Sequence, residues 1–518
     1  MKTLLQTFAF IALGCCTVPV AVFAQGKPVV LQNRTELFVD DYLVEKLERM
    51  EPRLGIPVSA GKALEFDRPW EGQFSIALTV IKTAGVYRMF YRGLGKTGGL
   101  DETHCYAESD DGIHWRRPEL GRVKLPSWPK NNVIAHAAGP KDAEQFNRRG
   151  SPNLLLDDRP GVPEDERYKA VTSIGVGRGH GMRIIVSKDG LTWRPLDPKA
   201  APIAVGYALD SANIITWVPA ENCYAIYMRG WTGDKPGVTP DTPNEFGRIS
   251  PFFHGVRTFM RSVSTDLVNW TKPEIMTFGD TPLEHFYTNS TQPYFRAPHI
   301  LIAMPMRFDP ELGSSVLTEA EFKESGIHPK MWKGVSDAVF MTSRGGNSFH
   351  RQFLEAVIRP GPDARNWGAR SQIVALGVVP TGPAEMSFYV NRAYATQGAF
   401  VERMTLRTDG FVSLQAGYQP GTAVTRPLVL RGSTFLLNFA SSPFGYVKVV
   451  LLDEAGRELP GFGEADAEVI RGDRVDRKVQ WKSGRTIADL GQQNIRIKFI
   501  AKDADIYSFG IYDSDRHP

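Results

Sequence analysis

Short strand-like runs recur along most of the chain, separated by turns rich in glycine and proline. Within each run, apolar residues alternate with polar ones or follow one another without a break, and both patterns are typical of β-strands. No long segment with a 3.6-residue apolar period competes with them, so the sequence predicts an all-β protein. Five of these runs precede a recurring turn and lie at residues 86–92, 167–171, 223–229, 299–304 and 385–390.

The recurring turn returns at a nearly constant spacing. It reads Ser-x-Asp-Gly-x-x-Trp at 109–115 and 187–193, is altered at 264–270 and degenerate at 343–349, and its serines lie 78, 77 and 79 residues apart. A weaker echo stands at 407–411. Asp and Gly favour a tight turn between two strands, and the aromatic residue after it packs back on the sheet. We interpret the pattern as a structural staple and not as a catalytic motif.

Five such units predict a five-bladed β-propeller over residues 33–418, a stretch of 386 residues that is close to five repeats. We expect residues 36–43 to supply the outer strand of the last blade and so to close the ring. A repeat this long leaves loops that can build a pocket. After residue 418 the repeat stops and short strands alternate with polar turns, which predicts a C-terminal β-sandwich over 419–518 that packs on the propeller.

The N-terminus has the pattern of an export signal. A lysine precedes an apolar run, and a Val-Phe-Ala sequence ends at Ala24, so we predict a signal peptide over residues 1–24. Gly14-Cys15 leaves a lipoprotein anchor open as an alternative. No other apolar run approaches the roughly 20 residues that a membrane span needs. The protein is therefore expected to be secreted or periplasmic, without a membrane span.

Composition narrows the choice of partners. The formal net charge is +4, from 61 basic and 57 acidic residues without a dense basic stretch, so nucleic acid is not expected as a partner. After removal of the signal only Cys105 and Cys223 remain, and two separate buried thiols are favoured over one disulfide bridge. Their spacing fits no zinc site. We predict no cofactor and no catalytic metal, and leave a structural Ca²⁺ open.

On the blade pattern, the Ser-x-Asp-Gly-x-x-Trp turns and the order of propeller and sandwich, residues 33–518 resemble the five-bladed glycosidase superfamily that includes glycoside hydrolase families 32, 43 and 68. Runs such as 37–43 and 294–299 are most similar to a secreted bacterial branch of it. The resemblance implies cleavage of glycosidic bonds by carboxyl groups that project into a central funnel from the starts of inner strands. One carboxyl group protonates the leaving oxygen while an ionised one attacks or activates water.

Three acids stand at predicted strand starts, namely Glu71, Asp210 and Glu284. Their intervals of 139 and 74 residues are near whole repeats, so all three are expected to face one funnel. The hypothesis makes Glu284 the general acid, Asp210 the charge that orients it, and Glu71 the nucleophile or base. The Asn-Asp-Pro and Arg-Asp-Pro frames of families 32 and 68 are missing, so retention and inversion both stay open. Asp40 and Asp41 are alternatives for the first acid and are interpreted as structural.

Polar side chains that could line the funnel gather in the segment 287–294, where amides and hydroxyls suit the hydroxyl groups of a sugar. A tryptophan could add a stacking face, although a tryptophan in a blade belongs more often to the core. The candidate sugar-binding residues are Trp70, Arg149, Asn153, Asn213, His254, Asn289, Gln292 and Arg296.

These observations predict a secreted glycoside hydrolase that acts on an oligo- or polysaccharide. The alternative is a carbohydrate-binding propeller protein without catalysis. The rival enzymes are a sialidase-like or a phosphorylase-like propeller, both acting on glycosides. A sialidase would need a cluster of arginines and a tyrosine nucleophile, and the sequence matches it poorly. The two main hypotheses differ in whether Glu71, Asp210 and Glu284 converge within roughly 10 Å in one pocket.

Overall fold

The computed structural model describes residues 28–94, 102–136, 153–176, 179–207, 209, 211–232, 255–312 and 316–513. Within these ranges the protein is mostly β, with several four-stranded antiparallel sheets of the kind that builds a β-propeller. The predicted signal peptide lies outside the described residues. None of the helices in the described ranges is long and apolar enough to cross a membrane.

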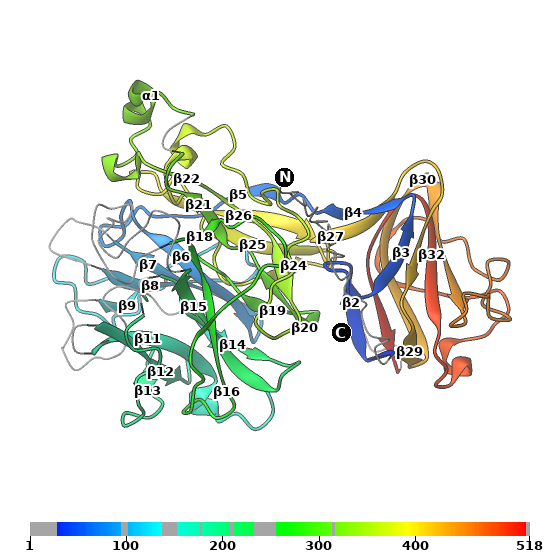
Figure 1. The fold of residues 1–518 in the computed structure, drawn as a ribbon. Helices are drawn as coiled ribbons and strands as arrows, with labels where there is room; N and C mark the ends of the chain where they lie inside the picture. Colours follow the sequence, from blue (N-terminus) through cyan, green and yellow to red (C-terminus); the bar gives the residue numbers. More distant parts are fainter. Residues whose placement is uncertain are drawn as a thin grey trace, which may run out of the picture.

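Four sheets of four antiparallel strands and one of three follow one another along the chain (Figure 1). The first contains β6 (Ile76–Thr83), β7 (Val86–Gly93), β8 (Thr103–Ser109) and β9 (Val133–His136). The second contains β10 (Leu155–Leu156), β11 (Tyr168–Val176), β12 (Gly179–Ser187) and β13 (Arg194–Pro195). The third contains β14 (Ile214–Val218), β15 (Cys223–Trp231), β16 (Arg257–Ser264) and β17 (Glu274–Ile275).

The fourth sheet contains β19 (Gln292–Tyr294), β20 (Ala297–Ala303) and β23 (Met341–Ser343). The fifth contains β24 (Val379–Gly382), β25 (Glu385–Arg392), β26 (Phe400–Arg407) and β5 (Val58–Glu65). Its outer strand thus comes from the N-terminal part of the chain, but the prediction that residues 36–43 supply it is wrong. The residues that pair with β26 are those of β5, because 34–54 are already taken up by the C-terminal sheet.

Hydrogen bonds join the first strands of these five sheets, or the residues just before those strands, in a closed cycle. Leu154 N donates to Thr79 Oγ1 (3.1 Å), Asn289 Nδ2 donates to the Ala212 carbonyl (3.3 Å), and Ser290 Oγ donates to the Val374 carbonyl (2.7 Å). The second and third sheets meet at a parallel bridge between Asn153 and Ile214, and the fifth meets the first where Val80 N donates to the Leu376 carbonyl (2.7 Å). Buried hydrophobic clusters fill the space between each sheet and the next.

The predicted turns hold these sheets as staples. In the first copy, Gly112 N donates to Ser109 Oγ (2.9 Å), and Asp111 Oδ1 accepts from the backbone of Ile113 and His114 (2.7 and 2.8 Å). The second and third copies repeat this pattern, and their tryptophan Nε1 atoms donate to backbone carbonyls inside the turn (3.0 Å). In each copy the Asp carboxylate accepts hydrogen bonds from the backbone of its own turn, which confirms the structural interpretation of the motif.

A short insertion stands between the third and fourth sheets and inside the fourth. It consists of a three-stranded sheet and a six-residue helix, and it projects at the top of the molecule in Figure 1. Its elements are β18 (His285–Phe286), β21 (Met306–Asp309), α1 (Glu319–Glu324) and β22 (Val335–Ala338). Short 3₁₀ helices lie at Glu164–Glu166, Pro329–Met331, Ala364–Trp367 and Ile487–Leu490.

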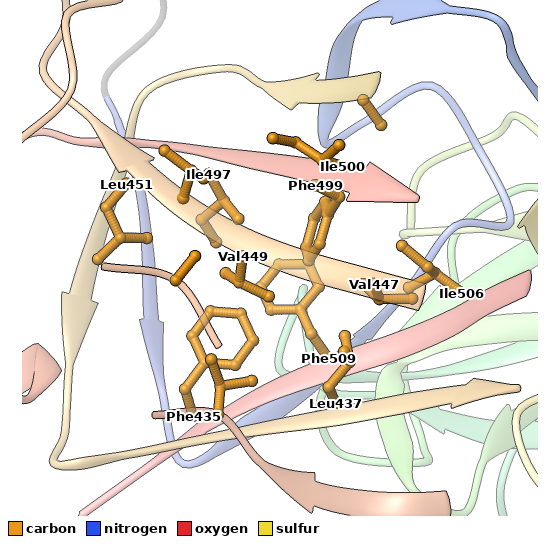
Figure 2. Packing of buried hydrophobic residues seen from close by; sticks show 14 of the residues in the cluster. Phe435, Leu437, Val447, Val449, Leu451, Ile497, Phe499, Ile500, Ile506 and Phe509 are labelled. Carbon is orange, nitrogen blue, oxygen red and sulfur yellow. The ribbon is translucent and has the colours of Figure 1, made fainter. Parts of the chain in front are cut away.

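The C-terminal part forms an eight-stranded sheet with its own hydrophobic core. Strands β30 (Thr434–Leu452) and β32 (Arg496–Tyr512) are long and interrupted by register shifts. Their apolar side chains, among them Phe435, Val449 and Phe509, point into that core (Figure 2). N-terminal strands complete the sheet. Its members are β2 (Arg34–Leu37), β3 (Val44–Glu48), β4 (Met50–Leu54), β27 (Val412–Ala416), β28 (Gly421–Thr425), β30 (Thr434–Leu452), β31 (Asp473–Lys478) and β32 (Arg496–Tyr512), beside the parallel pair β1 (Val29–Gln32) and β29 (Leu428–Arg431).

Candidate functional site

The five sheets surround a cavity at the point where their first strands begin. Its lining combines hydroxyl, amide and guanidinium groups with aliphatic walls, and every one of the five sheets or its connecting segment contributes to it. We call this the central cavity. Its lining residues are Ile76, Ala77, Leu78, Arg92, Asn153, Ser211, Ala212, Ile214, Tyr287, Thr288, Ser290, Arg370, Ile373, Val374 and Tyr394.

Arg92 reaches the cavity from the end of β7. It stands opposite Ile76, the first residue of β6, because the two strands are antiparallel. Its Nη2 donates to the Phe74 carbonyl (2.9 Å). Burial lowers the pKa of Arg92, but Tyr394, Glu102 and Tyr287 raise it more, so the guanidinium stays charged.

Tyr287 is the aromatic centre of the cavity wall. The guanidinium carbons of Arg229, Arg370 and Arg257 lie 4.4, 4.8 and 5.1 Å from its ring centre. Such distances suit cation–π contacts. The Tyr287 carbonyl accepts from Ser211 Oγ (2.7 Å) and from Arg229 Nη2 (3.1 Å), so its position is held from the third sheet.

Arg370 adopts a left-handed backbone conformation with φ of 74°. This region is unfavourable for a residue with a Cβ atom and persists only where the surroundings impose it. Arg370 N donates to Ser336 Oγ (3.0 Å), and Ser336 Oγ in turn donates to Gln372 Oε1 (2.8 Å). Ser290, also in the cavity lining, has φ of 54°.

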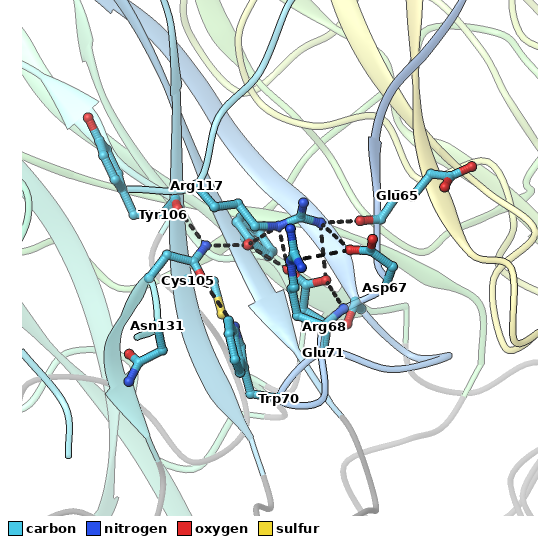
Figure 3. Close-up of polar contacts among 12 residues, drawn as sticks. Glu65, Asp67, Arg68, Trp70, Glu71, Cys105, Tyr106, Arg117 and Asn131 are labelled. Carbon is cyan, nitrogen blue, oxygen red and sulfur yellow. Dashed lines mark hydrogen bonds and ion pairs between the residues drawn. The ribbon is translucent and has the colours of Figure 1, made fainter. Parts of the chain in front are cut away.

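Glu71 lies in a buried network between the first sheet and the segment that precedes it (Figure 3). Tyr91 Oη donates to Glu71 Oε1 (2.7 Å), Arg117 Nε donates to the same oxygen (2.9 Å), and Arg68 N donates to Oε2 (2.9 Å). Burial raises the pKa of Glu71, although Arg117 and these hydrogen bonds oppose it. Trp70 belongs to the same network, since its Nε1 donates to Asn132 Oδ1 (2.9 Å). Neither Glu71 nor Trp70 is part of the central-cavity lining.

Glu284 lies beside the insertion and forms ion pairs with Arg307 (2.9 Å) and Arg351. It borders a groove of about 920 Å³ that Phe308, Ser336 and Asp337 also line. The structure therefore places Glu71 and Glu284 in separate networks. Asp210 lies outside the described residues, although its neighbour Ser211 lines the central cavity.

The candidate sugar-binding residues are distributed over several places. Asn153 lines the central cavity. Asn289 and Asn213 donate their Nδ2 groups to the carbonyls of Ala212 (3.3 Å) and Leu209 (3.0 Å), so both connect strand ends within the fold. Arg149 and His254 lie outside the described residues.

The two remaining candidates lie away from the central-cavity lining. Gln292 Oε1 accepts from Val378 N (3.2 Å) at the opposite end of the same strands. Arg296 forms ion pairs with Asp409 (3.2 Å) and Asp476 (2.8 Å), where the C-terminal sheet packs on the fourth and fifth sheets.

Sequence reasoning missed Arg92, Arg370 and Tyr394 as cavity residues. The antiparallel rule could have found Arg92, because a residue at the end of a second strand faces the start of the first. The segment 287–294, expected to line a polar funnel, does contribute Tyr287, Thr288 and Ser290.

Two chemical expectations concern metals and thiols. Among the described residues, no group of three or more His, Cys, Asp or Glu side chains is placed to hold a metal ion. Cys105 and Cys223 are buried and free, which confirms the prediction of two separate thiols.

Comparison with known proteins leaves the family open at the level of sequence. No family model and no curated protein matches the chain. The structure is similar, at low identity, to glycoside hydrolases and related carbohydrate-active β-propeller proteins. At TM-scores below 0.5 this similarity carries no argument about activity.

Three solved structures illustrate the similarity. An N-acetylgalactosamine deacetylase from F. plautii has a TM-score of 0.39 and 10% identity, over 70% of this chain and 97% of that one. A fructofuranosidase from Schwanniomyces occidentalis has a TM-score of 0.34 and 9% identity, over 88% and 98%. An α-L-arabinanase from Penicillium chrysogenum has a TM-score of 0.37 and 10% identity, over 68% and 98%.

Proposed function

We propose that the five sheets are the blades of a five-bladed β-propeller and that the C-terminal sheet folds into a β-sandwich. The closed cycle of hydrogen bonds between first strands supports the ring, and β5 supports its closure in the fifth sheet. The C-terminal sheet has a separate hydrophobic core, to which the long strands β30 and β32 both contribute side chains. This core supports a second, layered domain. The signal-like N-terminus supports export to the periplasm or the medium.

Within this ring, the protein acts as a glycoside hydrolase on an oligo- or polysaccharide. The observation that carries this proposal is the central cavity, where each of the five sheets or its connecting segment presents a hydroxyl, amide or guanidinium group. Convergent polar groups in one concave site suit the many hydroxyl groups of a sugar. The 920 Å³ groove lies next to it, because Ser336 lines the groove and accepts from the backbone of cavity residue Arg370.

Glycosidic cleavage needs two carboxyl groups on opposite sides of one bond. We include Asp210, which the sequence analysis makes the charge that orients the general acid, as a candidate for one of these groups, since it directly precedes cavity residue Ser211. Glu102 is a further candidate, because it is buried beside Arg92 and 4.0 Å from His104 Nε2. Glu71, in the buried network of the first sheet, and Glu284, at the border of the groove, stay candidates for the catalytic carboxyl groups.

A carbohydrate-binding propeller without catalysis is the second candidate function. It is favoured by the ion pairs of Glu71 with Arg117 and of Glu284 with Arg307 and Arg351, which hold both carboxylates outside the cavity lining.

The test measures hydrolysis of a broad panel of oligosaccharides and aryl glycosides by the full mature chain. Asp210→Asn and Glu102→Gln are expected to lower turnover by at least about 100-fold, because each removes a carboxyl group from acid–base chemistry. Glu71→Gln and Glu284→Gln show whether the other two predicted acids contribute. Binding of panel sugars without turnover by any form of the protein would replace the hydrolase with the binding protein.

A further inference from the structure

The insertion builds a groove beside the central cavity. The volume of this groove is about 920 Å³, which falls in the range of about 300 to 1,000 Å³ that is usual for ligand pockets. Its walls come from the three strands of the insertion sheet (β18, β21 and β22) and from residues 356–367. None of these segments belongs to the repeated four-stranded sheets. The groove is therefore an addition to the ring and not a consequence of the repeat.

The groove and the central cavity share a wall. Ser336, in the groove, accepts through its Oγ from the backbone N–H of cavity residue Arg370 (3.0 Å). The ring of groove residue Phe308 packs edge-on against the ring of cavity residue Tyr287, with 6.0 Å between the ring centres. His285 lines the groove, and Tyr287, two residues later, lines the cavity. A chain of sugars that leaves the cavity over this wall therefore enters the groove.

Trp367 gives the groove an aromatic wall. Its side chain is half-buried, and its Nε1 donates to the Gly361 carbonyl (2.9 Å), which holds the ring in place. Among the described residues, no second ring and no cation packs against this ring, whereas Trp70 packs against Trp128. A ring that is already held loses little freedom when a ligand binds, and its apolar face suits the C–H face of a sugar.

The polar groups next to this aromatic wall are fixed by one another. Arg307 donates through Nε to Asp337 (2.9 Å) and through Nη1 to Glu284 (2.9 Å). Arg351 forms a second ion pair with Glu284. An ionised carboxyl group has about four acceptor sites, so these carboxylates still accept from a ligand. A few fixed polar groups in a largely apolar groove suit the hydroxyl groups of a sugar.

We propose that the groove binds sugar units of the same glycan chain that occupies the central cavity, with Trp367 as the stacking surface. The protein then prefers substrates of several linked sugars to short ones. This inference rests on the proposed function for the place of the glycan at the cavity. It adds a second binding region, built by the insertion, that recognises the length of the chain.

The experiment measures how recognition by the full mature chain depends on the length of the glycan. The probes are the disaccharides and hexasaccharides of the cello-, xylo-, manno-, arabino-, galacto- and fructo-oligosaccharide series. Dissociation constants are measured by calorimetry, and kcat/KM is measured for any series that is cleaved. In at least one series we expect the hexasaccharide to be preferred about tenfold or more over the disaccharide, because its further sugar units reach the groove.

Variants of Trp367 locate this preference in the groove. Trp367→Ala is expected to reduce the preference for the hexasaccharide about tenfold, whereas Trp367→Phe keeps a ring and should retain most of it. Trp217→Ala is the matched control, because Trp217 is a half-buried tryptophan on β14 outside both linings. It should leave the preference unchanged.

A second variant decides the matter if Trp367→Ala fails to fold. Leu312 lines the groove and is 54% exposed, so Leu312→Arg obstructs the groove without changing the core. It should also remove the preference for the hexasaccharide. Leu47→Arg, at an exposed leucine on β3 of the C-terminal sheet, is its control and should keep the preference.

The outcomes separate this inference from the proposed function. Cleavage of glycans without any dependence on their length overturns the inference and leaves the hydrolase standing. Length-dependent binding that is lost in a groove variant, without cleavage, supports the inference and overturns the hydrolase. A preference for the hexasaccharide that persists in both Trp367→Ala and Leu312→Arg, or no such preference in any series, overturns the inference.

Discussion

Arginines serve two different purposes in two regions of this molecule. At the junction between the C-terminal sheet and the fourth and fifth sheets, each arginine is matched to carboxylates, as Arg344 is to Glu36 (3.0 Å) and Asp40 (2.6 Å). At the central cavity, Arg92 and Arg370 line a concave surface, and Arg92 also has Tyr394 and the buried Glu102 beside it. The junction is defined by Glu36, Asp40, Arg296, His299, Arg344, Arg407, Asp409, Asp473 and Asp476.

The difference shows how to separate structural charge from ligand-binding charge. A buried pair with well-matched geometry positions two elements, and the removal of one partner leaves an uncompensated charge in the interior. Charges that line a cavity have room for an exogenous partner. Junction variants should therefore change stability without changing binding, and cavity variants should change binding and activity.

The largest effect is expected at the junction from Glu36→Gln. Glu36 is fully buried on β2 and contacts His299 (3.1 Å) and Arg344 on the fourth sheet. Loss of its charge should lower the free energy of unfolding by about 3 kcal/mol, measured by urea denaturation at pH 7. Glycan binding should remain unchanged. A Glu45→Gln variant at an exposed ion pair with Arg496 is the control and should cost little.

The second-largest effect is expected at the central cavity and concerns activity. Arg92→Gln should reduce kcat/KM on the substrate found in the panel on the order of 100-fold, because a charged donor is lost from a concave site. Lys82→Gln lies at the other end of β6 and should leave kcat/KM unchanged. Equal losses of activity in both variants would contradict the assignment of the site to one end of the strands.

The two regions should lose stability over different ranges of acidic pH. Burial raises the pKa of Glu36, but His299, Arg344 and Arg34 lower it more, from its usual 4.5 to about 2. This carboxylate therefore contributes stability above pH 4.5 that is lost as the pH falls toward 2. Between about pH 6.5 and 3, the loss of stability should come instead from His104, which lies beside cavity residue Arg92. Burial and the adjacent Arg92 lower the pKa of His104 from 6.5 to about 3.

Because folded His104 binds its proton less readily than the unfolded chain does, its contribution is present above pH 6.5. That contribution is lost as the pH falls toward 3, by up to about 1.4 kcal/mol per pH unit. Urea titrations from pH 7 to 4 should show this slope, and His104→Gln should flatten it. The exposed His114→Gln serves as the control and should keep the slope. An unchanged slope in His104→Gln would assign the titration to another group.

The smallest effect should come from Ser211→Ala. Ser211 Oγ donates to the Tyr287 carbonyl (2.7 Å), so its loss loosens the aromatic wall by about one hydrogen bond, or about 1 kcal/mol. KM should rise severalfold while kcat changes little. Ser262→Ala removes a similar hydroxyl-to-carbonyl bond (2.6 Å, to Thr271) on β16 and provides the control. A fall in kcat with constant KM would instead place Ser211 in the chemical step.

Much of the fold follows from local pattern. The strands, the repeated sheets and the Ser109–Asp111 turn were all predictable, because alternation of apolar residues and turn-forming side chains act over a few residues. The closing strand was not, since residues 36–43 and β5 are both plausible edge partners. Only the competition with the C-terminal sheet, which pairs β2 with β32, decides between them.

The candidate site was harder to predict from the sequence than the fold. Asn153 and the segment 287–294 were predicted as lining, but Glu71 and Glu284 were expected to share one funnel and instead lie in separate ion-pair networks. An acid at a strand start has the same local sequence whether an arginine from elsewhere pairs with it or a cavity opens beside it. The partner depends on register and on the order of sheets.

The sequence by itself determined an all-β chain with a repeated unit of strands and stapled turns, because these depend on neighbours along the chain. Only the tertiary structure decided which charges meet one another and which meet a cavity. Arg92 reaches the cavity through its antiparallel register with Ile76. Arg370 reaches it because its own backbone is left-handed and its N–H group donates to Ser336 Oγ. Contacts between residues far apart in the chain set both, so no local pattern encodes them.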